Sequence, residues 1–383
     1  MTDGAETLGR FIDAGKLGRA QPKYQLLKGC LVAELAAGRL KPGQALPSED
    51  SLATRFRVAR STVRHALAEM ERSGLVRRVQ GSGTYVEDQV QTQLKQGLDL
   101  FALIVPVLEV GYYLTLQRGF ESSCKESHCQ MIVSCSEDNL AKQSDILMQL
   151  LDKQVGGIAL LPAPCAPTPL YQVRQIRQRG IPLVLCHRGI EGFSAPLLEI
   201  PFQDVGRFAG ETLARHGHRR VAYFPAQPGG AVPIYTAGLR EALGAIGGSM
   251  PDEFIYGGSA NHSLLVQQEA KVLAALKEMF KHPHPPTAIF VSFDPDAELL
   301  YLLLGQLGIR VPDDVSLISF GGATRESAIL KRITAVTVDE AELGRRAAKW
   351  LYEMRVGERA LDSNEKAVMP LVHYHGQTVG NAP

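Results

Sequence analysis

Seven arginines lie between Leu52 and Gln80, a stretch that contains only two acidic residues, Glu69 and Glu71. The chain of 383 residues has a formal net charge of only +1, so this excess of positive charge is local. Guanidinium groups donate paired hydrogen bonds to phosphate oxygens and to the edges of guanine bases. The segment therefore predicts a surface that binds a polyanion such as DNA.

A helix is expected to carry the central arginines. Four apolar residues have the i, i+3, i+4, i+7 spacing of one buried helix face: Val63, Ala66, Leu67 and Met70. The pattern predicts a helix from about Arg60 to Ser73. Ser61, Arg64 and His65 then point outward, with Arg60 one turn before Arg64.

Two further helices precede this one. Residues 24–38 show three-to-four apolar spacing, and Ser48 is placed to cap a short helix whose first turn carries Glu49 and Asp50. A short helix, a tight turn and a second helix with arginines at its N-terminal end form a helix-turn-helix, whose second helix enters the major groove.

A hairpin is expected after the helix, which ends at Gly74. Residues 75–79 and 84–86 read as short strands around the loop Gln80-Gly81-Ser82-Gly83. Gly81 and Gly83 allow positive φ angles and a close approach of the backbone to a sugar-phosphate strand. Arg77 and Arg78 are placed to meet phosphates.

The chain changes character after a polar linker at residues 88–98. Apolar strand-like runs alternate with helical patterns up to about residue 205, and the alternation then recurs. This indicates two successive α/β lobes with parallel sheets and a ligand cleft between them, at the carboxyl ends of the strands. We therefore expect an extension at 1–21, an α+β winged helix-turn-helix domain at 22–87, a two-lobed α/β domain at 99–376 and a tail at 377–383.

Several classes of protein are disfavoured. The sequence contains no GxSxG, P-loop or HExxH motif, which argues against an enzyme. The six cysteines lack metal-site spacing and are expected to be reduced thiols, while His282, His284, His373 and His375 are expected to be surface residues, so we predict no metal and no cofactor. A long apolar stretch and a secretory signal are both missing, which favours a cytoplasmic protein with no membrane segment.

The front of the chain resembles the GntR family of bacterial transcription regulators over residues 22–87, in "LPSEDSLA" and "VARSTVRHALAEMERSGLVRRVQGSGTYV". The resemblance implies that Arg60, Ser61, Thr62 and Arg64 face the operator and that Gly81 and Gly83 lie in the wing. The complete set of candidate DNA-binding residues is Ser48, Arg60, Ser61, Thr62, Arg64, His65, Arg77, Arg78, Gly81 and Gly83. Asp50 stands where many members have an arginine that touches DNA, and Ala59 replaces the usual small hydroxyl residue.

The back of the chain resembles the effector-binding domain of LacI/GalR regulators, which shares the fold of periplasmic sugar-binding proteins. The match covers roughly residues 99–376 and is best in "ARHGHRRVAYF" and "ITAVTVDEAELGRRAAKWL". The implied pocket comprises Tyr112, Tyr113, His187, Arg188, Tyr235, Phe293 and Asp294. Tyr235 and Phe293 stand where an arginine and an asparagine are usual, and Gly321 replaces an aspartate. The pocket is thus more aromatic than the family norm and is compatible with an unusual sugar, a glycoside or another molecule.

Two pocket assignments have alternatives. Asp294 precedes a helical pattern that begins with Pro295, so it is a candidate helix N-cap as well as a ligand group. One of the adjacent residues Tyr112 and Tyr113 is expected to pack in the core.

Together the two resemblances predict a chimeric regulator of the arabinose-repressor type: a homodimeric repressor that binds operator DNA and is controlled by a small molecule, expected to be a carbohydrate. The alternatives are a transport-type sugar-binding protein and an architectural DNA-binding protein without an effector. The basic front domain disfavours the first alternative, and the large two-lobed domain disfavours the second.

Overall fold

The computed structural model describes residues 23–36, 40–72, 74–79, 81–87, 100–108, 111–163, 166–226, 231–257 and 265–383. The chain divides into two compact units, residues 1–98 and residues 99–383. Each unit has its own hydrophobic core. The expected extension at 1–21 and the expected linker at 88–98 lie outside the described residues.

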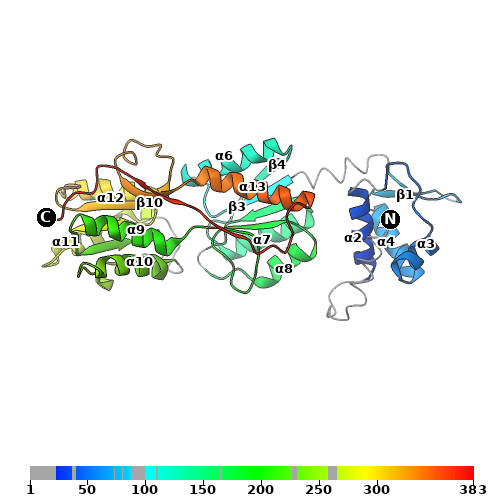
Figure 1. Cartoon of the computed structure of the whole chain (residues 1–383), viewed down its shortest axis with the longest axis horizontal. Coiled ribbons are helices and arrows are strands. Elements are labelled where there is room, and N and C mark those ends of the chain that lie inside the picture. The colour runs from blue at the N-terminus through cyan, green and yellow to red at the C-terminus, as the bar shows by residue number, and fades with distance from the viewer. Residues whose placement is uncertain are drawn as a thin grey trace. The chain divides into compact units, whose positions relative to one another are not determined.

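The first unit is a small winged helix-turn-helix (Figure 1). Its elements are α2 (Lys23–Ala36), α3 (Glu49–Phe56), α4 (Arg60–Arg72), β1 (Val76–Val79) and β2 (Gly83–Val86). The two strands pair antiparallel, and Ala45 adds an isolated bridge to Tyr85. The buried face of α4 is the predicted one, because Val63, Ala66, Leu67 and Met70 all pack in the core of this unit.

The first lobe of the second unit is built on a six-stranded parallel sheet in the order β12-β7-β6-β5-β3-β4. Its strands are β3 (Leu100–Val105), β4 (Gln130–Cys135), β5 (Gly157–Leu160), β6 (Leu183–His187), β7 (Leu197–Glu199) and β12 (Lys366–Val368). Its helices are α6 (Gly111–Glu126), α7 (Leu140–Asp152), α8 (Leu170–Gln178) and α13 (Glu340–Val356).

The second lobe contains a five-stranded sheet in the order β13-β11-β10-β9-β8, in which β13 is antiparallel to its neighbour and the other pairs are parallel. Its strands are β8 (Val221–Phe224), β9 (Ala288–Val291), β10 (Ser316–Gly322), β11 (Thr334–Val338) and β13 (Leu371–Tyr374). Its helices are α9 (Phe202–Arg215), α10 (Val232–Gly244), α11 (Glu269–Lys281) and α12 (Asp294–Gln306), with short 3₁₀ turns at Asp252–Phe254 and Leu265–Gln268.

The chain passes between the two lobes three times: from β7 to α9, from β11 to α13, and from β12 to β13. Helix α13 therefore follows a strand of the second lobe but packs on the first, beside α6 (Figure 1). A Cβ at Gly119 of α6 or at Gly344 of α13 would lie about 2 Å from a backbone oxygen of the facing helix, so the two glycines permit this close packing. The predicted two-lobed α/β architecture is confirmed.

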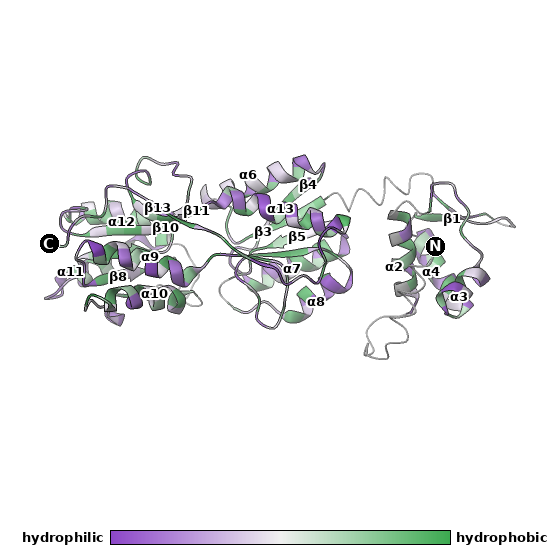
Figure 2. Cartoon of the chain, in the orientation of Figure 1, coloured by the Kyte–Doolittle hydropathy of each residue, from purple (hydrophilic) through white to green (hydrophobic). Residues whose placement is uncertain are grey.

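Hydrophobic residues are concentrated along the strands of both lobes, while the helices carry polar outer faces (Figure 2). The segment at 377–383, which the sequence sets apart as a tail, packs against the second lobe. The hydroxyl of Thr378 donates to the carbonyl oxygen of Leu317 at 2.6 Å, and the amide of Ala382 donates to the carbonyl oxygen of His216 at 2.8 Å. This segment therefore contributes to the structure of the second unit.

Candidate functional site

Helix α4 presents a basic face at its N-terminal end. The side chains of Arg60 and Arg64 are 58% and 60% exposed, one turn apart on the face opposite the core. Ser61 and His65 are also exposed. Arginines at the start of such a helix have the length to reach base edges in the major groove.

Glu49, at the start of α3, holds both arginines. Its Oε2 lies 3.4 Å from Nε of Arg60 and 3.2 Å from a terminal nitrogen of Arg64. Partial burial raises the pKa of Glu49, but hydrogen bonds from Arg64 and Arg60 outweigh this effect, so the net shift is downward. Asp50 adds a second ion pair to Arg60 at 3.1 Å. The acidic first turn of α3 therefore restrains and partly neutralises the two arginines.

The remaining candidates on the helices have identifiable local roles. The hydroxyl of Ser48 accepts a hydrogen bond from the amide of Ser51 at 3.2 Å, so the predicted N-cap of α3 is confirmed. The ring of His65 stacks on that of Tyr24 with centroids 4.0 Å apart. The amide of Thr62 donates to the carbonyl oxygen of Ala59, closing the first turn of α4.

The wing has the backbone that its glycines predict. Gly81 and Gly83 have φ angles of +77° and +126°, which residues with a side chain rarely adopt. The guanidinium of Arg77 lies 5.7 Å from the ring centroid of Tyr85, and Arg78 pairs with Glu71 at 3.5 Å. Arg78 also donates to the carbonyl oxygen of Arg64 at 3.3 Å, which ties the wing to α4.

In the second unit, both lobes line a cavity of about 130 Å³. The loops after β3, β4, β5 and β6 supply one wall, and β8, α10, β10 and the segment before α12 supply the other. Six of the seven candidate effector residues lie on its lining: Tyr112, Tyr113, His187, Arg188, Tyr235 and Phe293. The cavity thus lies at the carboxyl ends of the parallel strands, where the sequence places it.

Tyr112, Tyr113 and His187 form an aromatic cluster on this lining. A hydrogen bond of 2.9 Å joins the hydroxyl of Tyr112 to Nε2 of His187, and the two tyrosine rings meet edge to face at 5.2 Å. Both tyrosines line the cavity and both also pack against the hydrophobic core, although a core position was expected for only one of them. Tyr112 and Tyr113 lie in the first turn of α6, and both side chains are part of the cavity lining.

His187 is neutral at physiological pH. Burial, and after it the positive charge of Arg188, lowers the pKa of His187 to about 3. Burial likewise raises the pKa values of Tyr112 and Tyr113 above their usual range. His187 also has a φ angle of +69°, an uncommon conformation for this residue type. Strained backbone of this kind concentrates at binding sites.

Asp294 differs from its predicted position. Its carboxylate is not part of the cavity lining but is buried beneath it, where Oδ2 pairs with Arg325 at 2.5 Å and Oδ1 accepts from the hydroxyl of Ser319 at 2.7 Å. Helix α12 begins at Asp294 itself, and its N-cap is Phe293, so Asp294 is not the N-cap. Arg325 is 31 residues away in sequence, so no residue pattern around Asp294 indicates this ion pair.

Gly321 is required by this arrangement. A Cβ at Gly321 would lie 1.6 Å from Oδ2 of Asp294, and one at Gly322 would lie 2.6 Å from the carboxylate of Glu340. The carboxylate of Glu340 in turn accepts hydrogen bonds from the amides of Ala323 and Thr324. The glycine that replaces an aspartate in the family pattern thus makes room for a buried ion pair.

Several lining residues were not selected from the sequence. They are mostly aromatic or polar: Asp138, Phe202, Tyr223, Ser292 and Phe320. Phe202 follows an apolar run and Phe320 ends one, so both have the sequence pattern of core residues. Glu49 was recognised as a first-turn acid, but its pairing with Arg60 and Arg64 depends on the packing of α3 against α4.

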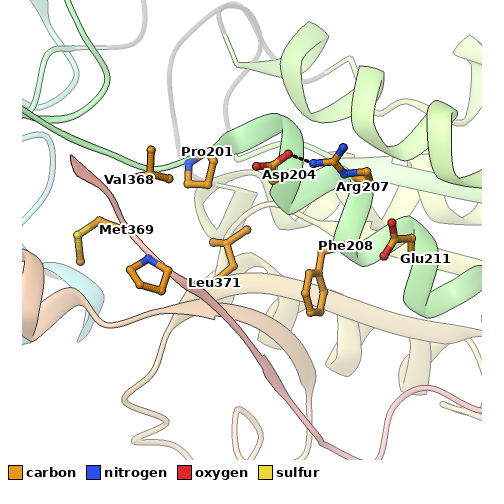
Figure 3. Close-up of a pocket in the computed structure, with 9 residues that line it drawn as sticks. Pro201, Asp204, Arg207, Phe208, Glu211, Val368, Met369 and Leu371 are labelled. Atoms are coloured by element: carbon orange, nitrogen blue, oxygen red, sulfur yellow. Dashed lines mark hydrogen bonds and ion pairs between the residues drawn. The ribbon is translucent and has the colours of Figure 1, made fainter. Parts of the chain in front are cut away.

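A wider groove of about 330 Å³ lies on another part of the second unit, between α9 and the chain that crosses from β12 to β13 (Figure 3). Asp204 and Arg207 form an ion pair at its rim, and Phe208 and Leu371 contribute apolar surface. The groove contains none of the candidate residues, whereas the smaller cavity is lined by His187, Tyr112 and Tyr113, whose pKa values are shifted by burial. We therefore take the smaller cavity as the candidate ligand site.

The described part of the chain shows neither a metal-binding cluster nor a membrane-spanning helix. It holds no group of three or more His, Cys, Asp or Glu residues arranged to bind a metal ion. His282 and His284 are exposed, as is His375, whereas His373 is half-buried against Phe208. Among the described helices, none is both long and apolar enough to cross a membrane.

Two family models match the chain, one in each unit. Residues 23–86 match the bacterial regulatory proteins of the gntR family, and residues 211–375 match a periplasmic binding protein-like domain. The arabinose metabolism transcriptional repressor of Geobacillus stearothermophilus is 26% identical over 349 residues, which are 89% of this chain and 93% of the relative. The HTH-type transcriptional repressor PurR of Escherichia coli O139:H28 is 25% identical over 67% of this chain and 73% of its own.

Solved structures agree on the fold. A putative LacI transcriptional regulator from Bacillus cereus subsp. cytotoxis superposes with a TM-score of 0.62 at 20% identity, covering 74% of this chain and 99% of its own. A structure titled as the complex of transcriptional regulator CelR with cellobiose gives 0.59 at 22% identity, covering 86% and 100%. The chain therefore joins a gntR-family winged helix-turn-helix to a periplasmic binding protein-like domain, and it is a DNA-binding transcriptional regulator.

Proposed function

We propose that this regulator is a repressor whose affinity for operator DNA is controlled by a small molecule bound in the cavity between the lobes. The observation that carries the proposal is the pairing, in one chain, of an exposed arginine face on α4 with a cavity lined by both lobes. The names of the relatives, which include repressors and a complex with a sugar, support it.

In this proposal, the DNA-binding domain spans residues 22–87 and the ligand-binding domain begins at residue 99. Arg60, Ser61, Thr62 and Arg64 contact base edges, while the wing and Arg77 and Arg78 contact phosphates. Phosphate contacts position the protein and base contacts give sequence specificity. A homodimer presents two such helices to the two halves of a palindromic operator.

The ligand contacts both walls of the cavity, so its binding favours a closed arrangement of the lobes. A ligand shifts a conformational equilibrium only by the difference of its affinities for the two states. We propose that Tyr112, Tyr113, His187, Arg188, Tyr235 and Phe293 supply this difference. Asp294 and Arg325 hold the wall beneath them.

The test begins with an operator selected from a random duplex library by the full-length protein. Fluorescence anisotropy then compares Arg64→Ala with the wild type and with Arg72→Ala, a control at the far end of the same helix whose arginine is 68% exposed. Loss of a bidentate contact to a guanine costs about 1–3 kcal/mol, so we expect Arg64→Ala to weaken operator binding about tenfold or more. Equal weakening in both variants, or none in either, would contradict the placement of α4 in the groove.

A further inference from the structure

We infer that the effector is a small carboxylic acid bearing a hydroxyl group, whose carboxylate pairs with Arg188. This inference rests on the proposed function, because it names the class of molecule that the cavity takes. It specifies the charge of the ligand, which the expectation of a carbohydrate left open. Four observations carry it: the position of Arg188, its lack of an ion pair among the described residues, the aromatic lining, and the size of the cavity.

Arg188 is the cation of the cavity. It directly follows β6, lines the cavity, and is mostly shielded from solvent, with its guanidinium 5.4 Å from the ring centroid of Phe202. Its Nε atom is buried without a hydrogen-bond partner. Of the ion pairs recorded among the described residues, none includes Arg188. A partly buried guanidinium without an ion pair costs the folded protein free energy, and a ligand carboxylate offsets this cost through paired hydrogen bonds.

Among the described residues, the groups near Arg188 form no ion pair with it. The histidine beside Arg188, His187, is neutral. The acid that the sequence places in the pocket, Asp294, is already paired with Arg325 and lies outside the lining. Asp138 does line the cavity, but no ion pair joins it to Arg188.

Asp138 and the aromatic residues of the lining restrict the other groups that the ligand carries. A carboxylate accepts hydrogen bonds, so Asp138 favours a hydroxyl group on the ligand and disfavours a second carboxylate. The rings of Tyr113, Phe202 and Phe293 present apolar surface to a flat or ring-shaped body. The cavity of about 130 Å³ is close to the roughly 150 Å³ of an apolar cavity that takes up benzene. The ligand is therefore a monocyclic hydroxy acid.

The experiment uses matched pairs that differ in the carboxyl group: 4-hydroxybenzoate with 4-hydroxybenzamide, and glucuronate with glucose. The first pair tests an aromatic acid, and the second tests a sugar acid. Calorimetric titration of the full chain should show, for at least one pair, that the acid binds about tenfold or more tightly than its neutral partner. Arg188→Met should abolish this preference, and Arg188→Lys should retain part of it.

Arg177→Met is the matched control. Its guanidinium also lies over an aromatic ring, 4.2 Å from the centroid of Phe193 in the same lobe, but Arg177 is outside the cavity. This variant should bind the acid as the wild type does. The inference is overturned if the neutral partner of each pair binds as well as its acid, if neither acid binds, or if Arg188→Met retains the preference.

The outcomes also separate this inference from the proposed function. A neutral sugar that changes operator affinity would overturn the acid and leave ligand control of the repressor standing. An acid that depends on Arg188 for binding but leaves operator affinity unchanged would support the ligand class and contradict ligand control. The anisotropy assay with the selected operator distinguishes the two cases.

Discussion

Replacement of Asp294 by alanine tests the buried ion pair beneath the cavity. The side chains of Asp294 and Arg325 are 8% and 3% exposed, and their charged atoms are 2.5 Å apart. Removing one partner of a buried pair leaves the other charge uncompensated, which costs about 3–5 kcal/mol. For a unit of this size, each kcal/mol lowers the melting temperature by about 2–4 °C. Asp294→Ala should therefore lower the melting temperature of the second unit by about 10 °C.

The assay is thermal unfolding of the full chain, with two further variants. Arg325→Met combined with Asp294→Ala should be less destabilised than the sum of the single changes, with a coupling of about 2 kcal/mol, because no charge is then left unpaired. The coupling free energy is limited because Arg325 also donates hydrogen bonds to the carbonyl oxygens of Leu330 and Ile333, and the double variant loses these bonds. Asp314→Ala breaks the exposed pair with Arg310 in the same unit and should change the melting temperature little.

Operator binding separates this structural role from a direct role at the ligand. At a temperature where Asp294→Ala is folded, its affinity for the selected operator should equal that of the wild type, because the residue lies in the ligand-binding unit. A variant that keeps its melting temperature and loses its response to ligand would refute the reasoning. That result would support the predicted role of Asp294 as a residue that contacts the ligand.

Three other perturbations give independent tests. Glu49→Gln removes the carboxylate that partly neutralises Arg60 and Arg64. In anisotropy titrations this variant should therefore bind all duplexes more tightly, with a steeper dependence on salt. Weaker binding to every duplex would contradict this expectation. His187 has a folded pKa of about 3, below its unfolded value, so it favours the folded state above pH 6.5 and this contribution falls as pH decreases toward 3. Between pH 7 and pH 5.5 the wild type should lose about 1 kcal/mol more stability in urea titrations than His187→Gln, and parallel losses would contradict the neutral histidine. Gly321→Ala forces a Cβ against Asp294 and should lower the free energy of unfolding by about 1–3 kcal/mol or more. In the control Gly305→Ala on α12, the added Cβ meets nothing within 4 Å, so this variant should not be destabilised in the same melting assay.

The sequence predicted features that depend on neighbouring residues. The spacing of apolar residues defined both faces of α4, and the cap at Ser48 requires only the amide three residues later. The positive φ angles at Gly81 and Gly83 follow from the hairpin between two short strands. These properties are set within one or two turns of chain, so a local pattern contains enough information.

Features that depend on distant packing could not be predicted. Asp294 and Arg325 are brought together by the ends of β9 and β10, and no local pattern marks them as partners. The same holds for Glu49, which reaches Arg64 across the turn between α3 and α4. Phe202 lines the cavity although its sequence context is that of a core residue. Six of the pocket residues that the family resemblance implies lie on the lining, and their role in ligand binding stays a prediction.

In the proposed mechanism, a ligand in the cavity controls the affinity of α4 and the wing for operator DNA. The most direct measurement is the operator dissociation constant of the full chain, by anisotropy at fixed salt, with and without a compound that raises the melting temperature of the wild type. Coupling free energies between linked sites are typically about 1–3 kcal/mol, so the account predicts a change of about fivefold or more that is lost in Tyr113→Ala. An operator dissociation constant that is the same at zero and at saturating ligand would contradict the account.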